Sequence, residues 1–127
     1  MAPLTPGDWR YERQGTGSVA LFGGAGAGLV TLRCDMARRQ ITLSLSGAAV
    51  GQSVPVTIRT TSGTLAWTGT AGTTQSQVVA ISRPASDPGF DWISYSRGRV
   101  SVEAQGMTRL ILPVWAEISR VIEDCRG

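Results

Sequence analysis

The chain has 127 residues, 42% of them hydrophobic, and a formal net charge of +3. These values are typical of one soluble globular domain, 1–127, and no apolar run approaches the roughly 20 residues of a membrane-spanning helix. Histidine and lysine are both missing from the sequence, which removes the commonest general base and zinc ligand as well as Schiff-base chemistry. We therefore expect a domain that is not an enzyme and that needs no metal and no cofactor.

Short alternations of apolar and polar residues follow one another from residue 9 to residue 83. This period of two is typical of half-buried antiparallel strands, and Gly-containing turns separate the runs. Strands are expected over 9–13, 18–22, 30–36, 41–45, 54–60, 64–70 and 77–83. Together with a later hairpin they make about eight strands, so we predict an all-β fold, an antiparallel sandwich or barrel.

A glycine-rich segment, 23–28, separates the second and third of these strands. Such a segment can cradle a phosphate group when the N-terminus of a helix follows it. Here a period-two strand follows instead. We therefore interpret the segment as a flexible hairpin loop.

The strand pattern breaks at residue 84, and a short helix is expected near 87–95. Ser86 or Asp87 can cap this helix, and Pro88 suits its first turn. Asp87 and Asp91 are four residues apart, so they could form a catalytic carboxylate pair, or join Ser86 in a calcium site. We favour the simpler interpretation, in which Asp87 caps the helix and Asp91 favours its N-terminal dipole.

The segment 96–125 is expected to form a hairpin followed by a helix near 113–125. Pro113 suits the first turn of that helix, because its missing N–H would have no partner there anyway. The apolar positions of the helix recur every three or four residues and form one stripe, Trp115, Ile118, Ile122 and Cys125. We therefore expect the helix to pack on the sheet with Cys125 on its buried face.

The two cysteines, Cys34 and Cys125, both fall on positions that are expected to face inward. In an oxidising compartment such a pair suggests a disulfide, which would close a loop of about 90 residues and stabilise the fold by about 4–5 kcal/mol. The alternative is a pair of buried thiols in a cytoplasmic protein. We favour the bridge and hence a periplasmic or secreted location, although no secretory signal is recognisable at the N-terminus.

A mixture of aromatic and arginine residues around the last hairpin is the candidate binding patch. It comprises Trp92, Tyr95, Arg97, Arg99 and Arg109, with Arg109 expected opposite the others on the partner strand. Such mixtures are enriched at protein interfaces and can also stack on nucleic-acid bases. A solvated strand face is the simpler alternative. The twelve basic residues are all arginine and are dispersed, which argues against a nucleic-acid partner.

The C-terminal sequence LILPVWAEISRVIEDC resembles the end of small periplasmic β-domains of the type VI secretion-associated and invasion-associated locus B kinds. The resemblance covers residues 99–125 and implies a non-catalytic accessory domain of the bacterial envelope with a protein partner. The chain also looks like small β-barrel protease inhibitors that carry one disulfide. In those proteins an N-terminal tail enters the protease cleft, and residues 2–6 can be compared with that tail. A small nucleic-acid-binding barrel is a third alternative.

Overall fold

The computed structural model describes residues 3–24, 29–47, 52–71 and 78–127. These residues form nine strands and two helices, which confirms the predicted all-β class with a short internal helix and a C-terminal helix. The strands are β1 (Asp8–Gln14), β2 (Gly17–Gly23), β3 (Val30–Asp35), β4 (Gln40–Ser46), β5 (Ser53–Thr60), β6 (Gly63–Ala71), β7 (Val78–Pro84), β8 (Arg99–Ala104) and β9 (Leu110–Pro113). The helices are α1 (Pro88–Ser94) and α2 (Ala116–Arg126). The predicted loops at 23–28, 47–53 and 71–75 fall largely outside the described residues.

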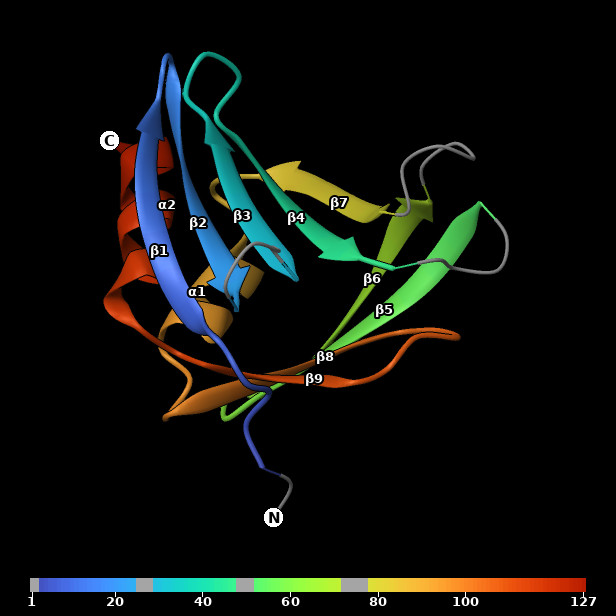
Figure 1. Ribbon diagram of the computed structural model, residues 1–127. Helices are drawn as coiled ribbons and strands as arrows, with labels where there is room; N and C mark the ends of the chain where they lie inside the picture. The colour runs from blue at the N-terminus through green and yellow to red at the C-terminus, as the bar shows by residue number, and fades with distance from the viewer. Residues whose placement is uncertain (1–2, 25–28, 48–51, 72–77) are drawn as a thin grey trace.

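The nine strands belong to one antiparallel sheet in the order β1-β2-β3-β4-β7-β6-β5-β8-β9. The sheet curls strongly, and the segment that leads into β1 passes beside β9 (Figure 1). The backbone N–H of Thr5 donates to the carbonyl of Ile111, and the indole N–H of Trp9 donates to the carbonyl of Pro113, both at 2.8 Å. The two edges of the sheet are therefore joined into a barrel-like arrangement.

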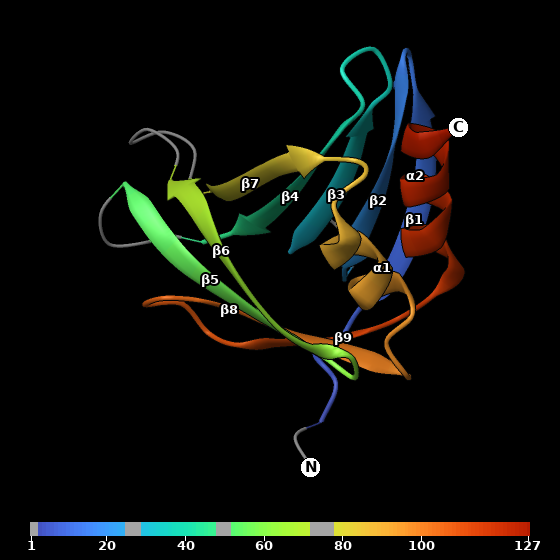
Figure 2. The same ribbon diagram turned by 180° about the vertical axis from the view of Figure 1, so that it is seen from behind.

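The hydrophobic core lies between the concave side of the sheet and the two helices. In β4, Ile41, Leu43 and Leu45 are buried while the residues between them are partly exposed, as the period of two predicts. Helix α2 packs against β1, β2 and β3 and touches α1 (Figure 2). Its buried residues are Ile118, Val121, Ile122 and Cys125.

Cys34 and Cys125 form a disulfide between β3 and α2, which confirms the predicted bridge. Their Cα atoms are 5.5 Å apart, and 91 positions separate them in the sequence. The bond therefore ties the last helix to a strand from the first third of the chain.

Helix α1 covers the region where two neighbouring strands diverge. Within the described ranges, strands β6 and β7 pair only through Thr70 with Ala80 and Ala71 with Val79. Beyond these pairs the ring of Phe90 on α1 packs 5.4 Å from the ring of Trp67 on β6. The short helix thus covers the part of the core that the unpaired ends of β6 and β7 leave open.

The C-terminal helix begins at Ala116, later than the predicted start near residue 113. Pro113 is the last residue of β9 and pairs with Arg99, so its placement in the first turn of the helix was wrong. A residue without an N–H suits the end of an edge strand equally well. Trp115 was also misplaced, because it is 41% exposed and Val121 takes its position in the buried stripe.

Candidate binding sites

The carboxylates of the short helix, Asp87 and Asp91, are both held in ion pairs. Asp87 accepts a hydrogen bond from the N–H of Gly89 at 2.7 Å, as the predicted cap requires, and pairs with Arg83 on β7. Asp91 lies 2.6 Å from the guanidinium of Arg126, and this hydrogen bond raises the pKa of Arg126. The two carboxylates therefore fasten α1 to β7 and to the end of α2.

The loop after α1 is exposed, yet hydrogen bonds fix its backbone. The hydroxyl of Ser96 donates to the carbonyl of Arg99 at 2.7 Å and accepts from the N–H of Thr61 at 3.2 Å. The N–H of Arg97 donates to the hydroxyl of Thr61 at 3.3 Å. Tyr95 precedes these residues and is 74% exposed. The loop thus presents its aromatic side chain on a well-anchored backbone.

Trp115 lies next to this loop. The N–H of Val114 donates to the carbonyl of Gly98 at 3.0 Å, which joins the segment before α2 to the segment after α1. Among the described residues the exposed large apolar side chains are Leu4, Tyr95 and Trp115. Two of them belong to the segments that this bond joins, because Tyr95 begins the loop after α1 and Trp115 directly precedes α2. We define the aromatic surface as Trp92, Tyr95, Arg97, Arg99 and Trp115.

Trp92 anchors one side of the aromatic surface and is itself partly buried. Its ring lies so close to Gly63 that a β-carbon there would sit 3.0 Å from a ring atom. Gly63 also has a φ of +151°, a backbone conformation that favours glycine. Trp92 therefore fixes α1 to the turn between β5 and β6.

Arg109, the fifth residue of the predicted patch, lies elsewhere. In the hairpin Arg99 pairs with Pro113 and Val102 pairs with Leu110, so Arg109 follows the turn at the opposite end from Arg99. The expected grouping of Arg109 with the aromatic residues does not occur. The sequence pattern showed a hairpin but not the length of its turn, which sets the register.

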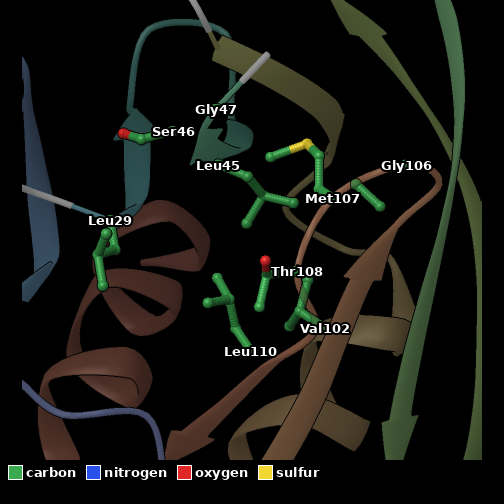
Figure 3. A pocket seen from close by; sticks show the side chains of 10 residues that line it. Leu29, Leu45, Ser46, Gly47, Val102, Gly106, Met107, Thr108 and Leu110 are labelled. Carbon is green, nitrogen blue, oxygen red and sulfur yellow. The ribbon is translucent and has the colours of Figure 1, made fainter. Parts of the chain in front are cut away.

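A second candidate site, the mouth pocket, opens on the concave side of the sheet (Figure 3). It lies between the start of β3, the end of β4 and the β8–β9 hairpin and has a volume of about 350 Å³. Its lining residues are Leu29, Leu45, Ser46, Gly47, Val102, Ala104, Gly106, Met107, Thr108 and Leu110. Sequence reasoning missed this pocket, because distant segments contribute its walls.

Met107 reaches across the mouth pocket toward Gly47 (Figure 3). A β-carbon at position 47 would lie only 2.6 Å from the terminal methyl group of Met107. Gly47 also has a φ of +145°, which side chains rarely adopt. The glycine therefore provides both the backbone turn and the space for the methionine.

A cluster of polar residues outside both sites holds α2 to β1. The Tyr11 hydroxyl donates to Asp124 at 2.5 Å, and the guanidinium of Arg120 lies 4.0 Å from the centroid of the Tyr11 ring. Burial raises the pKa of Asp124, but the Tyr11 and Ser18 hydroxyls and the charges of Arg13 and Arg120 together lower it by more. The net result is a pKa lower than that of an ordinary aspartate.

Within the described ranges no three His, Cys, Asp or Glu side chains gather in a way that could hold a metal ion. The helices described there are also too short or too polar to cross a bilayer. Comparisons of the chain with protein-family models, curated proteins and solved structures give no match. Function is therefore inferred from the geometry of the two sites.

Proposed function

We propose that this protein is a non-enzymatic accessory domain of the bacterial envelope or secreted space, and that it binds another protein through the aromatic surface. The Cys34–Cys125 disulfide supports an oxidising compartment, because such bonds persist mainly in periplasmic and secreted proteins. The resemblance of residues 99–125 to small periplasmic β-domains points in the same direction.

The observation that carries the proposal is the combination of exposure and anchoring at Tyr95. This residue is 74% exposed, while the backbone that follows it is bonded to Thr61 and, through Gly98, to Val114. Association costs less free energy when the contact residues are already ordered. Tyrosine, tryptophan and arginine also dominate the binding energy of protein interfaces. An anchored tyrosine, on a loop that also carries Arg97 and is bonded to the segment before Trp115, meets both conditions.

The charge of the aromatic surface indicates the chemistry of the partner. Arg97 is exposed and follows Tyr95 by two positions, so the loop that carries Tyr95 also carries a positive charge. Complementary charges across an interface favour encounter and fix orientation. We expect the partner to present an apolar cleft bordered by aspartate or glutamate.

The protease-inhibitor alternative depends on residues 2–6, of which Ala2 lies outside the described residues. The backbone N–H of Thr5 donates to the carbonyl of Ile111, and the backbone N–H of Ile111 donates to the side-chain hydroxyl of Thr5. Both hydrogen bonds measure 2.8 Å. A protease cleft would have to compete with these bonds. These hydrogen bonds favour a role for this segment in joining the edges of the sheet. Protease inhibition is therefore the second candidate function.

Affinity capture from the envelope fraction of the native cells tests the proposal. The double variant Tyr95→Ala/Trp115→Ala should lose the partner that the unaltered protein retains, because it removes both exposed rings. Leu4→Ala is the matched control, since Leu4 is 44% exposed but lies outside the aromatic surface. Equal capture by all three proteins would contradict the proposal.

Two further measurements separate the alternatives. An inhibitor should lose its effect on secreted proteases when residues 1–6 are deleted. A nucleic-acid binder should be retained on heparin, and its retention should fall steeply as salt is raised. If the Tyr95→Ala/Trp115→Ala variant still captures the partner, a positive inhibition test would favour a protease inhibitor over the accessory domain. A positive heparin test would in the same way favour a nucleic-acid binder.

A further inference from the structure

The mouth pocket has the size and the lining of a site for a small apolar molecule. Ligand pockets of proteins have volumes of about 300–1,000 Å³, are lined mainly by apolar side chains and occur at the mouths of barrels. The mouth pocket measures about 350 Å³. Leu45, Val102 and Leu110 form its apolar surface from two separate parts of the sheet (Figure 3).

The polarity of the lining restricts the ligand further. None of the ten described residues that line the mouth pocket is charged, and the side-chain hydroxyls come from Ser46 and Thr108. A charged group that leaves water for such a site would find no counter-charge, which is costly. A hydroxyl or ester group can instead hydrogen-bond to the hydroxyl of Thr108. The lining therefore suits a neutral molecule with one weakly polar end.

Met107 gives the mouth pocket an adaptable wall. Its side chain spans from the β8–β9 turn to Gly47 and is only partly buried. Methionine has three rotatable bonds and a polarisable sulfur, so it can repack around ligands of different shape. The methionine can thus adjust to a ligand without a change in the strands.

The mouth pocket and an apolar space in the core share one wall residue. Val102 lines the pocket and also lines an internal cavity of about 20 Å³. The walls of that cavity are entirely apolar and include Leu43, Ile58 and Ile118. An apolar void of this kind stays dry. The end of an aliphatic chain that rests on Val102 would therefore lie against a side chain that is backed by the apolar core.

We propose that the mouth pocket binds a neutral aliphatic molecule, with its hydrocarbon chain directed toward Val102 and its polar end near Thr108. This site is separate from the aromatic surface. The failure of either proposal therefore leaves the other one intact.

Isothermal titration calorimetry with three ten-carbon probes tests this inference: decanol, decanoate and decylammonium. Decanol should bind saturably with one site per chain. Decanoate and decylammonium should bind about tenfold more weakly or not at all, because each carries an uncompensated charge into the pocket. Absence of saturable decanol binding, or equal affinity for all three probes, would overturn the proposal.

A blocking variant locates the binding site. Thr108 is exposed, so Thr108→Trp should fill the mouth pocket without disturbing the core and should reduce decanol affinity by about tenfold or more. Gln105→Trp is the matched control, because Gln105 is exposed on the same turn but does not line the pocket. Both variants should unfold cooperatively at the same temperature when no ligand is present. Unchanged decanol binding by Thr108→Trp would show that the ligand binds elsewhere.

Discussion

The indole N–H of Trp9 donates a buried hydrogen bond of 2.8 Å to the carbonyl of Pro113, which joins the first strand of the sheet to the last. The two residues are 104 positions apart in the sequence. The Trp9 ring also packs 5.3 Å from the ring of Phe22 in the core. One side chain therefore both fills the core and links the two edges of the curled sheet.

Replacement of Trp9 by phenylalanine should lower the free energy of unfolding by about 1–3 kcal/mol, because it leaves the Pro113 carbonyl buried without its donor. Urea unfolding followed by circular dichroism measures this loss without depending on tryptophan fluorescence. Trp115→Phe is the matched control, and at this exposed position it should change stability by less than about 0.5 kcal/mol. Equal effects of the two variants would mean that the link between Trp9 and Pro113 contributes little.

Replacement of Gly47 by alanine should destabilise the fold by about 1–3 kcal/mol, since the backbone has a φ of +145° and the new methyl group would overlap Met107. The double variant Gly47→Ala/Met107→Ala should recover the steric part of this loss and retain the backbone part. Chemical denaturation of the single and double variants measures the coupling. Strictly additive effects would contradict the contact between Met107 and Gly47.

Removal of the disulfide in a Cys34→Ala/Cys125→Ala variant should lower the free energy of unfolding by about 4–5 kcal/mol, because the bond closes a loop of 91 positions. Denaturant titration under non-reducing conditions measures the difference from the unaltered protein.

A free-thiol count on protein from its native compartment should find none. Two free thiols there would argue for the cytoplasm and against the proposed location.

The lowered pKa of Asp124 predicts a specific loss of stability in acid. The pKa of Asp124 is lower in the folded than in the unfolded state. The ionised carboxylate therefore stabilises the fold fully above the unfolded-state pKa, and this contribution is lost as pH falls through the folded-state pKa. Tyr11→Phe removes a donor to this carboxylate, so the variant should be less stable than the unaltered protein at pH 7. The difference in the free energy of unfolding between the two proteins should become smaller below about pH 4. Urea titrations between pH 7 and pH 3 measure this difference, and Tyr95→Phe is the control at an exposed tyrosine. A difference in stability that does not change with pH would contradict the lowered pKa of Asp124.

Local patterns were sufficient to predict most of the fold. The alternation of Ile41, Leu43 and Leu45 indicates a strand because one face of it is buried, and Asp87 with Pro88 indicates the start of a helix. Pro113 is different, because a residue without an N–H suits either the first turn of a helix or the end of an edge strand. Only its pairing with Arg99, a tertiary contact, decides between the two.

The binding sites could be predicted less well, because they are assembled from distant segments. Tyr95 and Arg97 were predicted together as part of one surface patch, because they are close in the sequence. Trp115 fitted the period of the helix, and only the bond between Val114 and Gly98 places it beside that loop. The mouth pocket depends on the approach of Met107 to Gly47 across the concave side, which no sequence period encodes.

Site-specific photo-crosslinking tests the central claim most directly. A photoreactive phenylalanine analogue replaces Tyr95 in one protein and Leu4 in another, and both proteins are irradiated in the envelope of the native cells. The account predicts one discrete crosslinked protein from position 95 and none from position 4. Crosslinking from position 4 alone, or from neither position, would contradict binding through the aromatic surface.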